Sequence, residues 1–75
     1  MTELEMFAKS IIEDGNQWWE LEKSDKGGLY MSKKVYSDGR NDYYGTPMYQ
    51  VFNSEGKRIG VTPIYNDALA KYRRL

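Results

Sequence analysis

The stretch Met48–Thr62 constrains the fold of this chain most, because two short alternating runs flank the turn sequence Asn53-Ser54-Glu55-Gly56. Asn at the start and Gly at the end are typical of a type I turn closed by a left-handed glycine. The predicted hairpin has this register: Phe52 faces Arg58, Val51 faces Ile59, and Tyr49 faces Val61. Since side chains alternate along a strand, this register places Ile59 and Val61 in a core.

A second hairpin is predicted earlier in the chain. Residues 17–23 and 29–36 alternate between the two faces of a strand, and residues 24–28 between them have turn chemistry. Trp19 and Leu21 would face the core from the first of these strands.

Amphipathic helices are predicted at both ends. Residues 2–13 carry apolar side chains at three- and four-residue spacing, and Thr2 followed by Glu5 is a capping-box pattern. The second helix runs to about residue 74 and begins at Thr62-Pro63 or at Asn66-Asp67.

These elements predict an α+β fold in which residues 1–75 form one small domain. The order is α-β-β-β-β-α. Two hairpins make a four-stranded antiparallel sheet, and both helices pack on one face of it. The other face would stand open and display aromatic side chains.

The longest polar stretch, residues 37–46, joins the two predicted hairpins. It exceeds the usual connection of about 4–6 residues, so it is either a working loop or a flexible one. It carries Arg40, Tyr43 and Tyr44.

The chain has few side chains that are suited to catalysis. The chain has no histidine and no cysteine, which removes the usual general base, the thiolate nucleophile and the common zinc ligands. Glu20 and Glu22 share a strand face, but such a pair is typical of a solvated surface. We therefore predict that the protein is not an enzyme and holds no metal or cofactor.

The charge is balanced but unevenly distributed. Residues 1–22 carry six acidic side chains against Lys9, whereas residues 23–75 carry ten basic side chains against five acidic ones. The first residues are acidic, no secretory signal is visible, and no apolar run approaches the ~20 residues that cross a bilayer. We expect a cytoplasmic protein that does not enter membranes.

The predicted function is protein binding. Aromatic side chains make up 15% of the chain, and Tyr, Trp and Arg dominate binding hot spots. A small domain of this kind would act as an accessory inhibitor or regulator, of the phage or mobile-element type, by occupying the surface of a larger partner. The candidate contact residues are Tyr43, Tyr44, Arg40, Trp18, Tyr36, Phe52 and Arg58.

The alternative is binding of single-stranded or structured nucleic acid through an open aromatic and basic sheet face. The element order is similar to that of double-stranded-RNA-binding domains, but the Lys-Lys-x-x-Lys cluster of that family is replaced by Asn66-Asp67-Ala68-Leu69. The chain would be a monomer, or a homodimer that covers its exposed aromatics.

Overall fold

The computed structural model describes residues 2–13, 16–37 and 39–75. Five strands form one antiparallel sheet in the order β1-β2-β4-β5, and β3 pairs with the far end of β2. The elements are α1 (Glu3–Glu13), β1 (Asn16–Ser24), β2 (Gly27–Ser37), β3 (Asp42–Tyr44), β4 (Met48–Asn53), β5 (Arg58–Thr62) and α2 (Tyr65–Arg73). The predicted α+β class and the antiparallel sheet are confirmed.

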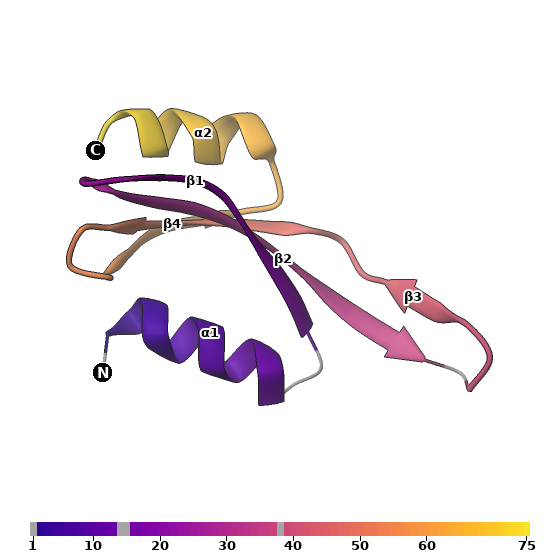
Figure 1. Ribbon diagram of the computed structural model, residues 1–75. Helices are drawn as coiled ribbons and strands as arrows, with labels where there is room; N and C mark the ends of the chain where they lie inside the picture. The colour runs from indigo at the N-terminus through magenta and orange to yellow at the C-terminus, as the bar shows by residue number, and fades with distance from the viewer. Residues whose placement is uncertain (1, 14–15, 38) are drawn as a thin grey trace.

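The two helices cover opposite faces of the sheet, so the prediction that both pack on one face is wrong. Figure 1 shows α2 on one side of the strands and α1 on the other. The cause lies in β2 and β4, which carry large apolar side chains on both faces. Leu29 and Val51 are buried toward α2, and Tyr30 and Phe52 are buried toward α1. A sheet that is apolar on both faces needs a layer on each side.

The core on the α1 side is aromatic. The ring of Phe7 lies 5.3 Å from that of Phe52 and 6.3 Å from that of Tyr30, and Leu4 packs against the same cluster. The Tyr30 and Phe52 rings meet edge to face at 5.6 Å. Edge-to-face packing of this kind stabilises beyond the burial of area alone.

The core on the α2 side is smaller and mostly aliphatic. Leu29 and Val51 are cross-strand partners, and Ala68 of α2 packs directly on them. Partly buried residues surround this cluster: Tyr49, Leu69, Tyr72 and Leu75. The small side chain of Ala68 lets the helix approach the sheet closely.

The polar stretch at residues 37–46 contains a fifth strand, whereas the sequence pattern predicts four strands in all. β3 pairs with the end of β2, so that Tyr36 faces Tyr43 and Val35 faces Tyr44. Within this stretch, Asp38 lies outside the described residues. Part of the segment, Ser37 and β3, therefore belongs to the sheet.

The hairpin of β4 and β5 follows the predicted register only next to its turn. Phe52 pairs with Arg58, as predicted, but a bulge then shifts the pairing by one residue, and Val51 faces Gly60. Ile59 and Val61 are consequently 39% and 51% exposed. Their predicted place in the core is wrong, because a one-residue shift exchanges the two faces of a strand.

The start of α1 agrees with its local capping signal, whereas α2 begins without a side-chain cap. The Thr2 hydroxyl accepts a hydrogen bond of 3.1 Å from the Glu5 backbone N–H, as the capping pattern predicts. α2 begins at Tyr65, between the two starts predicted for it. Thr62 does not cap it directly, since its hydroxyl accepts a bond from the Ile64 N–H instead.

Candidate aromatic binding surface

The sheet is longer than the helices that cover it. β2 has 11 residues and so extends about 36 Å, whereas the nine residues of α2 extend about 14 Å. α2 also begins beside Tyr49, since the rings of Tyr65 and Tyr49 meet at 5.4 Å. Neither helix of the described residues covers the part of β2 beyond that point on this face.

Aromatic and apolar side chains line this uncovered part. Trp19 of β1, Met31 of β2 and Tyr49 of β4 form a continuous cross-strand row. Tyr65 borders the row, and Tyr44 continues the same face at the β2–β3 hairpin. We call these five residues, Trp19, Met31, Tyr44, Tyr49 and Tyr65, the aromatic surface.

Lys33 connects the two parts of the aromatic surface. It lies on the same face of β2 as Met31, because the two residues are separated by one position. Its ammonium group lies 5.8 Å from the centre of the Tyr44 ring, within the range of a cation–π contact. The surface therefore combines apolar area with one positive charge.

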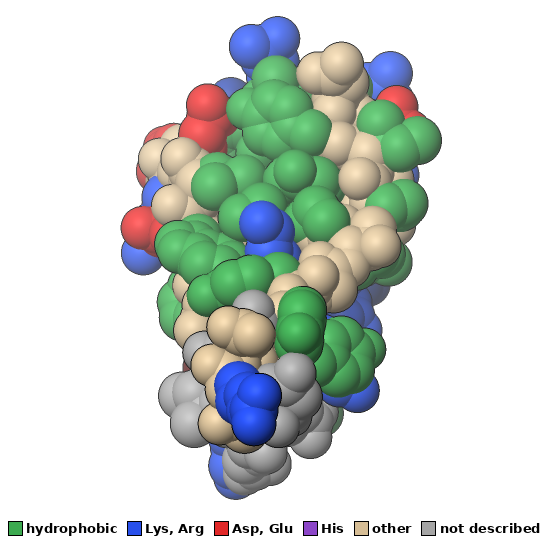
Figure 2. Space-filling view, turned by 90° about the vertical axis from the view of Figure 1, so that its right-hand side faces the viewer, with side chains coloured by type: hydrophobic (Ala, Val, Ile, Leu, Met, Phe, Trp, Pro, Cys, Tyr) green, Lys and Arg blue, Asp and Glu red, His purple; other side chains and the backbone are tan. Residues whose placement is uncertain are grey.

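Figure 2 views the molecule from the hairpin end, with α2 above the sheet. Hydrophobic side chains gather below α2 and continue down the sheet, with a basic side chain among them. Large exposed apolar patches on small proteins mark interaction sites.

The predicted contact residues of the hairpin are divided between the two faces. Tyr36 and Tyr43 are cross-strand partners, so they share the face that α1 covers elsewhere, whereas Tyr44 pairs with Val35 on the opposite face. Tyr43 and Tyr44 are 52% and 55% exposed. The predicted Tyr43-Tyr44 pair therefore offers two separate contacts, one on each side. Arg40 lies at the exposed turn between β2 and β3.

Phe52 does not belong to any exposed surface, and its prediction as a contact residue is wrong. It is 0% exposed, because α1 covers the sheet face that the sequence pattern leaves open. Trp18 lies on this face too, partly covered, with its ring 5.6 Å from that of Tyr30 and 6.3 Å from that of Phe7.

Arg58 lies far from the hairpin tyrosines. Phe52 pairs with both Arg58 and Gly28, and β2 rises about 26 Å from Gly28 to Tyr36. The guanidinium group of Arg58 donates a 3.1 Å hydrogen bond to the buried Gln50 side chain. Arg58 also lines a groove with residues of α1: Glu3, Met6 and Phe7.

Strand alternation predicts Trp19 in the core, yet it is 39% exposed. Its position on the strand is predicted correctly, and it does share the face of Leu29. What alternation alone cannot show is how much of that face a helix covers. The signal that would have found it is the mismatch in length between the predicted strands and the second helix.

Among the described residues, no three His, Cys, Asp or Glu side chains come together in a way that would hold a metal ion. Neither helix in the described part of the chain has the length and hydropathy needed to cross a bilayer.

Comparison of the chain with protein-family models, with curated proteins and with solved structures found no match.

Proposed function

We propose that this protein is a non-enzymatic binding module that docks onto another protein through the aromatic surface. The observation that carries the proposal is the cross-strand row of Trp19, which is 39% exposed, and the partly buried Met31 and Tyr49. Tyr65 borders this row at the start of α2, and Tyr44 extends it on the β2–β3 hairpin. An apolar area of this kind in water is stabilised when a partner covers it.

The composition of the surface supports a protein partner. Trp and Tyr contribute large contact area with few rotatable bonds, and they are the residues most enriched at binding hot spots. The rigid strands β1, β2 and β4 hold three of the five side chains in place, so little conformational entropy would be lost on docking. By covering part of a larger partner, such a module would act as an inhibitor or regulator.

A second candidate function is the binding of single-stranded nucleic acid. It is favoured by two lysine–tyrosine pairs on the hairpin, in which Lys33 lies over Tyr44 and Lys34 lies 5.3 Å from the Tyr36 ring centre. Proteins bind single strands with this combination, because aromatic rings stack on the bases and basic groups neutralise the phosphates. The two pairs lie on opposite faces of the hairpin, however, so one strand would not contact both along a single path.

The proposal is tested by capture from an extract of the native cell, with mass spectrometry of the retained protein. The test variant carries Trp19→Ser and Tyr44→Ser, and the matched control carries Tyr43→Ser, an equally exposed tyrosine on the other face. We expect one protein to be retained by the wild type and by the control, and lost by the test variant.

Other outcomes would contradict the proposal. Retained nucleic acid that is released between about 50 and 200 mM salt would favour the second candidate. Elution of the wild type as a dimer in size-exclusion chromatography, with the test variant as a monomer, would assign the surface to a second copy. Circular dichroism of each variant verifies that the fold is kept.

A further inference from the structure

β1 and β5 form the two outer edges of the sheet, and they differ in their protection. β5 has five residues, contains a bulge and leads directly to Pro63. The backbone N–H of its first residue, Arg58, already donates to the carboxylate of Glu3. A short, bulged edge of this kind resists pairing with another chain. β1, in contrast, has nine residues, and all of its described side chains are exposed.

The direction of the backbone groups in β1 follows from a hydrogen bond at the far side of the sheet. In β4 the Asn53 N–H donates to the Lys57 carbonyl, on the side of β5. Because the backbone groups of successive strand residues point to alternate sides, those of Phe52 point to β2. Phe52 pairs with Gly28, so the even-numbered residues of β2 face β4. The odd-numbered ones, among them Met31, face β1.

A hydrogen bond at the other end of β2 supports this assignment. The carbonyl of Lys34, also an even-numbered residue, accepts a 2.8 Å bond from the Gly45 N–H, which lies just after β3. Both ends of β2 therefore direct their even-numbered residues away from β1.

The outward backbone groups of β1 are consequently those of Trp18 and Glu20. Trp19, between them, pairs with Met31 and directs its own groups to β2. Within the described part of the chain, no residue forms a hydrogen bond with the outward N–H and C=O groups of Trp18 and Glu20. Such a row of unpaired groups is a template for an added strand. A bulge follows Glu20 and ends the regular part of this edge.

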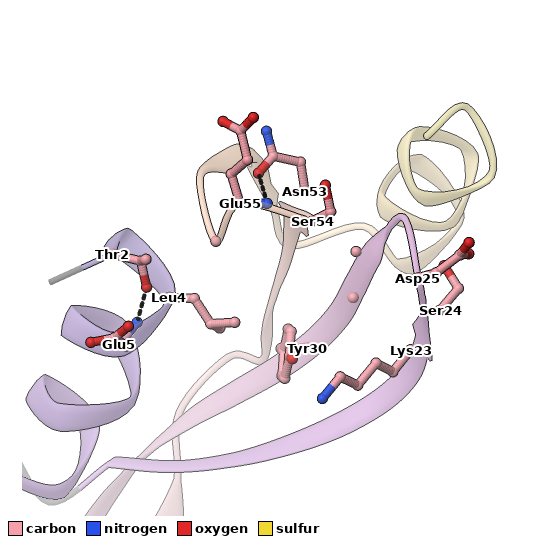
Figure 3. Close-up of a pocket in the computed structure, with 13 residues that line it drawn as sticks. Thr2, Leu4, Glu5, Lys23, Ser24, Asp25, Tyr30, Asn53, Ser54 and Glu55 are labelled. Carbon is pink, nitrogen blue, oxygen red and sulfur yellow. Dashed lines mark hydrogen bonds between the residues drawn. The ribbon is translucent and has the colours of Figure 1, made fainter.

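β1 also lacks a lysine on the regular part of its edge, where lysine commonly prevents pairing. Its lysine, Lys23, lies beyond the bulge. Figure 3 shows the Lys23 side chain directed toward Tyr30. Its ammonium group lies 3.9 Å from the Glu20 carboxylate, and both side chains of this pair are exposed. An exposed pair of this kind is weak, so the Glu20 carboxylate can still bind another cation.

We propose that the outer edge of β1 binds an extended segment of the partner protein as an additional strand, and that basic and apolar side chains alternate in this segment. The residue opposite Trp19 would lie on the face of the aromatic surface, where an apolar side chain continues the row of Trp19 and Met31. The residues next to it would lie on the other face, where a basic side chain contacts the Trp18 ring and the Glu20 carboxylate.

This inference rests on the proposed function, because the partner that covers the aromatic surface supplies the added strand. Strand addition gives affinity through main-chain hydrogen bonds and specificity through alternate side chains. A second copy of this chain fits the edge less well. The charged residues between positions 16 and 22 are Glu20 and Glu22, so two copies would bring acidic strands together.

The experiment uses a capped peptide of alternating lysine and valine as the probe, with ¹H–¹⁵N correlation spectra and amide hydrogen exchange as the readouts. In the free protein, the Trp18 and Glu20 amides should exchange faster than the Gln17 and Trp19 amides. The peptide should give saturable shifts at a Kd in the roughly millimolar range and should slow exchange at Trp18 and Glu20.

Two control peptides separate backbone pairing from charge. The same peptide with an N-methyl group on every backbone amide cannot donate to the edge, so it should give no saturable shift. A peptide of alternating glutamate and valine should bind about ten-fold more weakly or not at all, because it meets an acidic strand.

Variants of Glu20 make the same separation on the protein. Glu20→Gln removes the carboxylate and should raise the Kd about two- to three-fold. Glu20→Pro also removes the outward N–H and should raise the Kd about ten-fold, while the ladder with β2 is kept. Glu55→Gln is the matched control, since it removes an exposed carboxylate from the β4–β5 turn and should leave the Kd unchanged.

The inference is overturned if the lysine–valine peptide leaves exchange at Trp18 and Glu20 unchanged, or if its N-methylated form binds equally well. A free protein that sediments as a dimer and already protects these two amides would assign the edge to a second copy. Should Glu20→Pro fail to fold, the N-methylated peptide decides the matter.

Exchange in the complex with the captured partner distinguishes this inference from the proposed function. If Trp19→Ser abolishes capture but the Trp18 and Glu20 amides stay unprotected in the wild-type complex, strand addition is wrong and docking through the aromatic surface stands. If the two amides become protected but neither Trp19→Ser nor Tyr44→Ser weakens capture, docking through the aromatic surface is wrong and the edge site stands.

Discussion

Leu29 and Tyr30 are neighbours in β2, yet they are buried in different cores. The side chain of Leu29 packs beneath α2 with Val51 and Ala68, and that of Tyr30 packs beneath α1 with Phe7 and Phe52. One strand therefore holds the two layers of the molecule together. This relationship explains how a chain of 75 residues supports helices on both faces of its sheet.

Removal of a large side chain from either core should destabilise the whole domain. We expect Phe52→Ala to lower the free energy of unfolding by about 3–5 kcal/mol, and Leu29→Ala by about 2–5 kcal/mol, because each leaves a cavity in a fully buried site. Urea titration followed by circular dichroism measures both. A large loss for one variant and none for the other would contradict the two-sided core.

The part of the fold that sequence predicts well is the local part. The Asn53-Ser54-Glu55-Gly56 turn forms as expected, with the Asn53 side chain accepting 3.0 Å hydrogen bonds from the Glu55 and Lys57 N–H groups. Gly56 adopts a φ of 78°, which is the left-handed conformation its position requires. These interactions involve residues close in sequence, so the pattern alone contains them.

The part that sequence does not predict depends on contacts between distant segments. The bulge at Ile59 brings Gly60 to the α2 face, where the aliphatic part of the Lys71 side chain packs against it. Nothing in the alternation of β5 signals this contact, because it is made with a helix formed later in the chain. The same reason hides the burial of Phe52, since alternation cannot tell which face a helix will cover.

The bulged register and the regular register predict different effects of a substitution at Val61. Val61 is 51% exposed, so Val61→Thr should change the free energy of unfolding by no more than about 0.5 kcal/mol. In the regular register the same substitution would bury a hydroxyl group and cost about 1–3 kcal/mol. Chemical denaturation distinguishes the two values.

Gly27 should not tolerate a side chain. Its φ is 151°, and a Cβ atom would stand 2.1 Å from the carbonyl oxygen of Phe52. We expect Gly27→Ala to cost about 3 kcal/mol or more, through backbone strain and displacement of β4.

Gly39→Ala is the matched control for this substitution. Gly39 also has a positive φ, 90°, but a Cβ atom at this position would have no described atom within 4 Å. The substitution should cost about 1–2 kcal/mol, which is the strain of the backbone conformation alone. Equal decreases in melting temperature for Gly27→Ala and Gly39→Ala would argue against close pairing of Gly27 with β4.

Tyr30 should make stability depend on alkaline pH. Burial raises the pKa of its phenol, and the nearby Glu20 carboxylate raises that pKa further. The folded state therefore holds the phenol proton more tightly than the unfolded state. The resulting stabilisation is complete below the ordinary pKa of about 10 and is lost as pH rises through the folded value.

Comparison with Tyr30→Phe isolates this effect, because the other titrating groups are common to both proteins. The difference in unfolding free energy between wild type and variant should be constant from pH 7 to about 9 and should then move in favour of the variant. A difference that stays constant up to about pH 12 would show that the phenol is not buried as described.

The sequence predicts the residue types of the candidate site better than it predicts their arrangement in space. Tyr36, Tyr43 and Tyr44 are all exposed on the hairpin, as an interface would require. Their division between two faces follows from the pairing of β3 with β2, which the polar composition of that segment conceals. Trp19 joins the surface only because α2 begins at Tyr65, beside Tyr49, and does not extend over Trp19.

The central claim is that the protein acts by docking through the aromatic surface, and the binding free energy of single variants to the captured partner tests it most directly. Isothermal titration should give losses of about 2 kcal/mol or more for Trp19→Ser and for Tyr44→Ser, and less than about 1 kcal/mol for Tyr43→Ser. Equal losses for the three variants, or the largest loss for Tyr43→Ser, would contradict the claim.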